Sequence, residues 1–143
     1  MKPYKTFVKL DEDIFQDDKV RSLLKRGGFL AFGHYIGLLT VFRRYEDFHF
    51  RIPFDQISEV AEWDLHCKKA ELEKSIELCL DVGLFQEDGE MFWSERRSKD
   101  LTDQLDKLIA RRANAARSNE KRKANKQNVD NLIDSLIYKT TDK

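Results

Sequence analysis

The chain has 143 residues, of which 41% are hydrophobic, 36% charged and 11% aromatic, and its 26 Lys and Arg balance 26 Asp and Glu. This length is typical of one domain, and the aromatic content excludes a fully disordered chain. The longest uncharged stretch, residues 27–42, falls short of the roughly 20 apolar residues that a membrane-spanning helix needs. We therefore expect a soluble protein that makes no membrane contact.

The cysteine content favours a reducing, cytoplasmic location. The two cysteines, Cys67 and Cys79, do not form a C-x-x-C pair, and the N-terminal residues 1–13 lack the apolar run of a secretory signal.

The charges are distributed unevenly along the chain. Residues 107–143 carry 10 Lys and Arg against 4 Asp and Glu, whereas residues 1–106 carry 16 against 22. Within 107–126 there are eight basic residues, and Glu120 is the one acid. This asymmetry predicts an anionic partner for the C-terminal end.

The first predicted helix follows an acidic segment, residues 11–18 (DEDIFQDD). An i, i+3, i+4 apolar stripe predicts a short helix that is capped by Asp17 or Asp18 and ends at Gly27-Gly28. A cation site is the alternative interpretation of the acidic segment. The stripe consists of Val20, Leu23 and Leu24.

Residues 29–45 carry two apolar stripes at helical spacing and should form a central helix that is buried on most of its circumference. Gly33 and Gly37 lie four residues apart, which predicts the close approach of a neighbouring element. The stripes are Phe29, Phe32, Ile36 and Leu39, and Ala31, Tyr35, Leu38, Phe42 and Tyr45.

The alternation of apolar and polar residues over 48–52 predicts a strand that ends at Pro53. A short helix should follow over 55–62. A longer helix is expected over 64–82, with the Asp at its first position as N-cap and Gly83 as its terminator. Its predicted inward side chains are Leu72, Ile76 and Cys79.

A hairpin is predicted by Asp88-Gly89, which lies between two apolar runs and favours a tight turn with positive φ at both central residues. Strand, two helices and hairpin follow the order of a winged helix. We therefore predict a mainly α fold with a small β-hairpin sheet: a winged helix-turn-helix domain over 1–106 and a C-terminal helical extension over 107–143.

Two helices should follow the hairpin. Leu101, Leu105 and Leu108 predict one that begins near residue 98 and enters the basic stretch, and a clean amphipathic pattern predicts another over 127–143. A helix this short is marginal alone, so it is a candidate interaction or oligomerisation helix. Its apolar residues are Val129, Leu132, Ile133, Leu136 and Ile137.

Three sequence segments resemble the winged-helix N-terminal domain of phage-type replisome organiser and DnaD-like primosome proteins, many of which are domains of unknown function. They are F-x-K-L-D-E-D-I-F-Q-D-D-K-V-R-S-L (7–23), G-H-Y-I-G-L-L (33–39), and C-L-D-V-G-L-F running into M-F-W-S-E-R-R (79–97). The resemblance covers about residues 5–118, including the Ala/Arg/Ser-rich stretch 110–117.

The resemblance implies DNA binding or primosome assembly at a replication origin, often in phage or other mobile elements. Members usually carry a further C-terminal domain, so either the replication function is divided differently here or this chain is a fragment. Members often have a Trp after the Ala/Arg stretch, and this sequence has none there.

In a winged helix, the second helix of the pair enters the major groove, which would place Lys68 and Lys69 near the base edges. However, the helix carries more acids than lysines, and the hairpin tip is acidic, so contact with phosphates is disfavoured. An ordinary solvated helix face, or a protein contact, is the alternative.

The basic segment is the stronger electrostatic footprint for DNA. Five or six phosphate contacts there would give strong but largely nonspecific binding, since each steepens the salt dependence by about 0.9 in log–log slope. A solvated linker is the alternative. The predicted contact residues are Lys107, Arg111, Arg112, Arg117, Lys121, Arg122, Lys123 and Lys126, with Arg96, Arg97 and Lys99 leading into them.

Nothing in the sequence predicts an enzyme or a bound cofactor. The three histidines are scattered, and His66-Cys67 has no second pair at zinc-ligand spacing. Gly-rich phosphate loops and hydrolase motifs do not occur. Trp63 and Trp93 are expected in or at the edge of the core.

These observations favour a DNA-associated adaptor of replication initiation or primosome assembly, in which a winged-helix body contacts replication proteins and a basic arm holds DNA. The alternative is a protein interaction or oligomerisation module, with a homo-oligomer as one expected partner, that has no intrinsic DNA affinity. The acidic body and the amphipathic helix favour the alternative.

Overall fold

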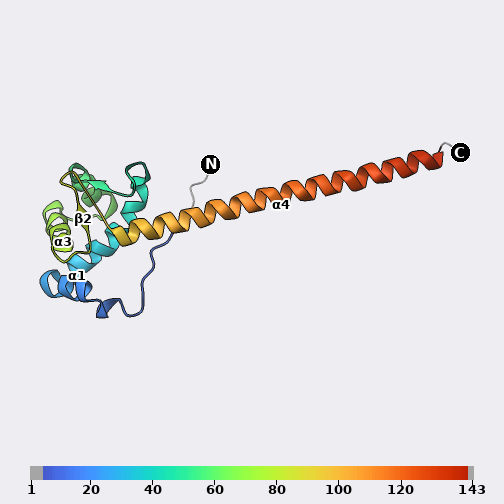
Figure 1. Ribbon diagram of the computed structural model, residues 1–143. Coiled ribbons are helices and arrows are strands. Elements are labelled where there is room, and N and C mark those ends of the chain that lie inside the picture. Colours follow the sequence, from blue (N-terminus) through green and yellow to red (C-terminus); the bar gives the residue numbers. More distant parts are fainter. Residues whose placement is uncertain (1–4, 142–143) are drawn as a thin grey trace. The chain divides into compact units, whose positions relative to one another are not determined.

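A computed structural model describes residues 5–141, apart from the side chains of residues 134, 135 and 137–141. The protein is mainly helical, with one small three-stranded antiparallel sheet (Figure 1). It divides into two units, Met1–Gln104 and Leu105–Lys143. The elements are η1 (Ile14–Gln16), α1 (Asp18–Val41), η2 (Phe42–Phe48), β1 (Ile52–Pro53), η3 (Phe54–Gln56), α2 (Ile57–Glu59), η4 (Val60–Asp64), α3 (Lys69–Asp81), β2 (Gln86–Glu87), β3 (Met91–Trp93) and α4 (Glu95–Thr141).

Helix α1 begins and breaks at the residues that the sequence indicates. The Asp17 carboxylate accepts hydrogen bonds from the backbone N–H groups of Lys19 (2.9 Å) and Val20 (3.1 Å), which confirms it as the N-cap. Gly28 has φ 66° and ψ −166°, so α1 consists of two helical parts joined at this residue. The predicted end of the first helix at Gly27-Gly28 is therefore confirmed.

Gly28 occupies a backbone region that is essentially restricted to glycine. We expect Gly28→Ala to lower the free energy of unfolding by about 1–3 kcal/mol, although no atom lies within 4 Å of an added Cβ. Gly33→Ala is the matched control, because Gly33 is helical, exposed and equally free of neighbours. That variant should gain about 0.5–1 kcal/mol. Urea denaturation measures the free energy of unfolding of both variants. Equal changes in the two variants would contradict a helix break at Gly28.

The second part of α1 buries one face rather than most of its circumference. Tyr35 and Leu38 are 6% and 0% exposed. In the stripe that begins at Phe29, Leu39 is 7% exposed, but Phe29 itself is 74% exposed, so the expectation that this whole stripe is buried is wrong. A Cβ on Gly37 would lie 2.7 Å from a Leu65 methyl, which confirms a close approach there, but Gly33 has no neighbour.

The predicted strand over 48–52 is mostly helix and turn. His49 and Phe50 have φ 57° and 61°, and these left-handed residues end η2 and turn Phe50 into the core, where it is 8% exposed. Only Ile52 and Pro53 form β1. Pro53 pairs within the sheet instead of ending it, because β1 is an edge strand and needs no proline N–H.

The helix predicted over 55–62 is present as η3, α2 and η4 in succession. The helix predicted from residue 64 begins later, at Lys69, with Lys68 as N-cap. Asp64 instead ends η4 and forms an ion pair with Arg44, while Cys67 N–H donates to Ala61 O (2.9 Å) within the turn. The inward side chains and Gly83 (φ 84°) are as predicted: Leu72, Ile76 and Cys79 are 0%, 2% and 0% exposed.

The predicted hairpin is confirmed, with a correction at its turn. Strands β2 and β3 pair antiparallel, and β1 pairs with the other edge of β3, giving the order β1-β3-β2. Within the turn, Gly89 has positive φ (93°) and Asp88 does not. The Asp88 carboxylate stabilises the turn, because it accepts hydrogen bonds from Met91 N–H (2.8 Å) and Glu90 N–H (3.0 Å). These two bonds lower the pKa of Asp88.

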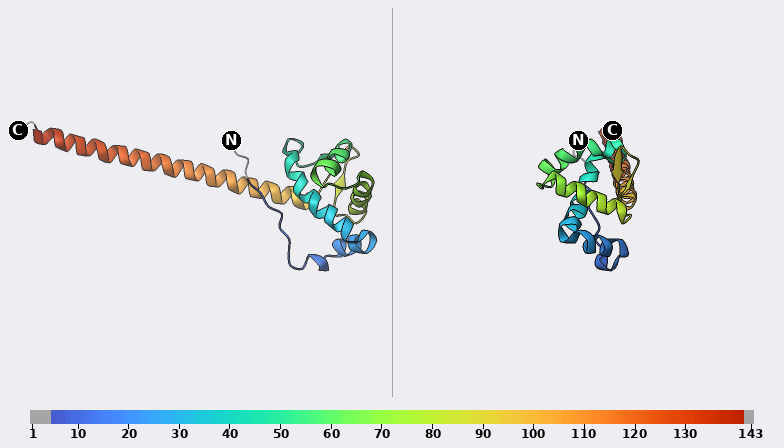
Figure 2. Two further views of the ribbon diagram at one scale, coloured as in Figure 1. Left: turned by 180° about the vertical axis from the view of Figure 1, so that it is seen from behind. Right: turned by 90° about the vertical axis from the view of Figure 1, so that its left-hand side faces the viewer.

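Aromatic side chains join the sheet to the helices in the first unit. Phe92 of β3 is fully buried and lies 5.8 Å from Phe42 and 5.9 Å from Phe85 between ring centroids. Phe85 also contacts Tyr35 of α1, at 5.6 Å. Helices α1 and α3 pack against each other (Figure 2). This core fixes α3 and the hairpin relative to α1.

A buried polar contact links α1 to α3. His34 Nδ1 lies 2.7 Å from Ser75 Oγ, and Ser75 Oγ donates to the Glu71 carbonyl (3.1 Å). The tautomer of His34 decides which of the two atoms, Nδ1 or Oγ, donates in this bond. Burial lowers the pKa of His34 from its ordinary 6.5, and the Glu71 carboxylate partly opposes this shift.

Because the unfolded chain binds a proton at His34 before the folded chain does, acid destabilises the fold at this residue. We expect the free energy of unfolding to be highest above pH 6.5 and to fall as the pH drops from 6.5 through the lower folded pKa. His34→Gln should lose less stability over the same interval. Denaturant titrations at a series of pH values test this, and identical pH profiles for the two proteins would refute it.

The two predicted C-terminal helices form one helix, α4. Residues 107–128 contain neither Gly nor Pro and are rich in Ala, Arg and Lys, so no residue interrupts the helical conformation. The first unit buries the start of α4, where Leu101 is 0% exposed.

Candidate nucleic-acid interface

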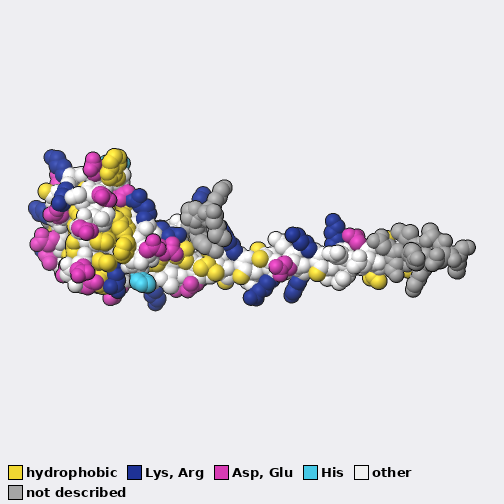
Figure 3. Space-filling model, turned by 90° about the horizontal axis from the view of Figure 1, so that it is seen from above, with side chains coloured by type: hydrophobic (Ala, Val, Ile, Leu, Met, Phe, Trp, Pro, Cys, Tyr) yellow, Lys and Arg dark blue, Asp and Glu magenta, His cyan; other side chains and the backbone are white. Residues whose placement is uncertain are grey.

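The basic segment, residues 107–126, is helical throughout and every basic side chain in it is exposed. At 1.5 Å per residue it extends ~30 Å, close to one turn of duplex DNA. Figure 3 shows the dark blue Lys and Arg side chains along this helix. The structure thus presents the eight predicted phosphate-contacting residues on one continuous element.

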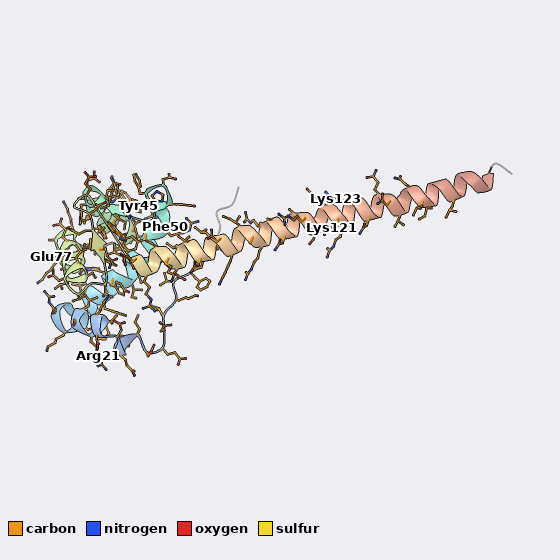
Figure 4. The ribbon with its side chains drawn as sticks, in the orientation of Figure 1. Arg21, Tyr45, Phe50, Glu77, Lys121 and Lys123 are labelled. Carbon is orange, nitrogen blue, oxygen red and sulfur yellow. The ribbon has the colours of Figure 1, made fainter. Side chains whose placement is uncertain are left out.

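The basic side chains are spread over about 240° of the helix circumference at 3.6 residues per turn. Lys121 and Lys123, labelled in Figure 4, project on opposite sides of α4. Glu120 falls in the remaining arc. This distribution suits a helix that has phosphates on more than one side, as in a groove, better than a helix lying on a flat anionic surface.

Lys68 and Lys69 are both exposed at the N-terminus of α3. The Lys69 ammonium lies 3.5 Å from the Glu73 carboxylate, and Glu71 and Glu77 are exposed farther along the helix. These lysines therefore lie at the N-terminal end of α3, within a mostly acidic surface.

The hairpin tip is also acidic. Glu87, Asp88 and Glu90 are exposed there, and Asp88 lies 3.6 Å from the Arg51 guanidinium. Arg51 covers the ring of Trp93 at 3.9 Å, which places Trp93 at the core edge as predicted. The tip presents no free positive charge to a phosphate backbone.

Arg97 is not available to DNA, which corrects its predicted role. It is 5% exposed, and its guanidinium donates to Leu39 O (2.8 Å), Phe7 O (2.9 Å) and the Asp100 carboxylate (3.3 Å). Burial lowers the pKa of Arg97, while Asp100 raises it. The side chain joins α1 and the N-terminal segment to α4.

The sequence contained a signal for this burial. Arg97 lies four residues before Leu101 and so shares the face of α4 that faces the core. Its neighbour Arg96 is exposed and forms a 2.8 Å ion pair with Asp11, and Lys99 is exposed. Arg96 and Lys99 thus remain candidates for a path that leads into the basic segment.

The predicted interaction helix is the last part of α4. Val129, Leu132, Ile133 and Leu136 are 53%, 64%, 48% and 65% exposed. The side chain of Ile137 lies outside the described residues. An apolar face thus follows the basic segment on the same helix.

Trp63 was expected at the core and is 71% exposed on η4 instead. It lies four residues after the exposed Glu59 and so shares the outer face of this helical stretch with that acid. A lone Trp beside buried Val60 and Ala61 gave no sequence signal that distinguishes an outward from an inward ring.

No three His, Cys, Asp or Glu side chains within the described part of the chain are placed together to hold a metal ion. None of the helices in this part has the length and apolar character needed to cross a bilayer.

The body of the protein matches a known family. The model of the Lin1244/Lin1753-like, N-terminal family matches residues 7–96. The chain belongs to this family. The Lin1244/Lin1753-like domain thus comprises η1 to β3 and ends at the start of α4, so the basic segment lies beyond it. No curated protein and no solved structure matches the chain.

Proposed function

We propose that the protein is a DNA-associated adaptor of replication initiation or primosome assembly, and that its basic segment holds DNA largely without sequence preference. The observation that carries the proposal is the set of eight exposed Lys and Arg side chains within 20 helical residues that contain a single acid. A segment of this charge is attracted to a polyphosphate through counterion release.

The body is proposed to act as a winged helix that contacts other replication proteins. The order β1, α2, α3, β2, β3, with β1 and β2 on either side of β3, supports this topology. The acidic α3 and hairpin tip support protein contacts rather than groove reading. The replication role itself rests on the resemblance of residues 7–23, 33–39 and 79–97 to replisome organiser and DnaD-like proteins.

The test is a fluorescence anisotropy titration of the full chain with two labelled duplexes of equal length and unrelated sequence, at about 50 mM salt. We expect similar affinities for the two duplexes. A strong preference for one sequence, abolished by replacing Lys68 and Lys69 with Ala, would instead assign DNA reading to α3.

A protein interaction module without DNA affinity is the second candidate, favoured by the exposed apolar face Val129, Leu132, Ile133 and Leu136. Absence of binding to either duplex, or to single strands, would favour it. Sedimentation of Leu132→Asp and Ile133→Asp variants then tests this face, because an unchanged mass excludes it as an oligomer seam.

A further inference from the structure

One exposed face of the first unit combines acidic and aromatic side chains. We call it the acidic aromatic face. Its members lie on η2 and on the stretch η3–α2–η4, and all of them are exposed. They are Glu46, Asp47, Phe48, Asp55, Glu59, Glu62 and Trp63.

The two elements of this face lie side by side. Arg44 of η2 forms an ion pair with Asp64 of η4. Burial raises the pKa of Tyr45, Arg44 opposes this shift, and the nearby Glu59 and Asp55 carboxylates add to it. Figure 4 labels Tyr45 at this part of the body. The stretch η3–α2–η4 thus brings Asp55 and Glu59 close to η2, the element that carries Glu46 and Asp47.

The face has an excess of negative charge and two apolar anchors. Arg43 lies 3.0 Å from Glu46, but among the described residues no ion pair engages Asp47, Asp55, Glu59 or Glu62. Trp63 is 71% and Phe48 47% exposed. Large exposed aromatics are typical anchors of protein interfaces. The partner chemistry that fits is a helix with basic residues beside apolar ones.

The chain itself contains such a helix. Residues 121–126 hold four Lys and Arg, and the exposed apolar residues of 129–136 follow on α4. The excess charges are equal and opposite, since residues 1–106 carry 16 basic against 22 acidic side chains and residues 107–143 carry 10 against 4. Complementary charge of this kind steers association and selects partners.

We infer that the acidic aromatic face binds the end of α4, residues 121–136, from a second copy of this chain. Basic side chains of that helix face the acids, and its apolar residues cover Phe48 and Trp63. The inference does not depend on DNA binding. If the basic segment also holds DNA, as proposed above, DNA and the second copy compete for it.

Analytical ultracentrifugation of the full chain, without DNA, tests the inference. We expect the average mass to rise with protein concentration at about 50 mM salt and to return to that of the monomer at about 500 mM, where screening is strong. A monomer at every concentration in low salt would overturn the inference.

Matched charge reversals locate the contact. Glu59→Lys with Glu62→Lys should weaken self-association about tenfold or more, since like charges then meet. The control is Glu77→Lys with Glu90→Lys, which changes the net charge by the same amount at exposed positions of α3 and the hairpin. The control should leave the strength of self-association within about twofold of the unaltered chain. Figure 4 labels Glu77 on α3. Equal weakening by both pairs would overturn the assignment to this face.

Trp63 provides a direct signal. In a Trp93→Phe variant, Trp63 is the only Trp, and its fluorescence should shift to shorter wavelength as the protein concentration rises in low salt. Trp63→Ser should weaken self-association without altering charge. A shift that is independent of concentration would assign the face to the chain's own helix and would overturn the second-copy inference.

Discussion

We expect duplex affinity at about 0.1 M salt to fall roughly 100-fold or more when four residues of the basic segment become Gln: Lys121, Arg122, Lys123 and Lys126. At this salt each lost phosphate contact removes nearly tenfold in affinity, and three or four contacts are removed together. Gln retains helix propensity, so α4 should persist. Anisotropy titrations measure the affinity, and circular dichroism checks the helix.

The matched control places four Gln substitutions on exposed lysines of the body: Lys25, Lys68, Lys69 and Lys74. Its net charge equals that of the first variant, and its affinity should stay within about threefold of the unaltered chain, because charges beyond a Debye length are screened. A larger loss in this control than in the first variant would move the DNA site to α3.

The second large effect is expected on stability. Arg97→Met should lower the free energy of unfolding by about 2–4 kcal/mol, because it leaves the Leu39 and Phe7 carbonyls without their charged donor and removes the pair with Asp100. Arg96→Met removes an exposed ion pair with Asp11 and should change the free energy of unfolding by less than about 1 kcal/mol.

Guanidinium denaturation of the two variants measures this difference. The comparison separates two adjacent arginines that the sequence pattern groups together as DNA contacts. Similar stabilities for Arg96→Met and Arg97→Met would contradict the structural role of Arg97.

Local signals predicted the element boundaries that depend on one residue's own chemistry. Asp17 caps α1, Gly28 breaks it and Gly83 follows α3, since a carboxylate near free N–H groups or a glycine at positive φ acts without distant partners. The inward face of α3 was likewise readable, because its apolar spacing is unambiguous.

Features that depend on distant contacts were not readable from the sequence. The alternation over 48–52 resembles a strand, but burial of Phe50 favours a left-handed turn at the end of η2. Asp is a common N-cap residue, but Asp64 forms an ion pair with Arg44, and the turn after η4 separates it from the start of α3. Phe29 and Trp63 are large and apolar, and only the arrangement of neighbouring elements leaves them exposed.

The candidate site was predicted in its main part and corrected at its edge. Exposure of the basic segment follows from its charge, because Lys and Arg side chains are rarely fully buried. Arg97 is the exception, since two of its three acceptors, the Leu39 and Phe7 carbonyls, come from elements far away in the sequence, and the third is Asp100 on the same helix.

The salt dependence of duplex binding by the full chain tests the central claim most directly. If five or six side chains of the basic segment contact phosphates, log K should fall against log salt with a slope of about −5, or roughly 1,000-fold between 50 and 200 mM. A slope near zero, or no binding at 50 mM, would contradict a basic helix that holds DNA.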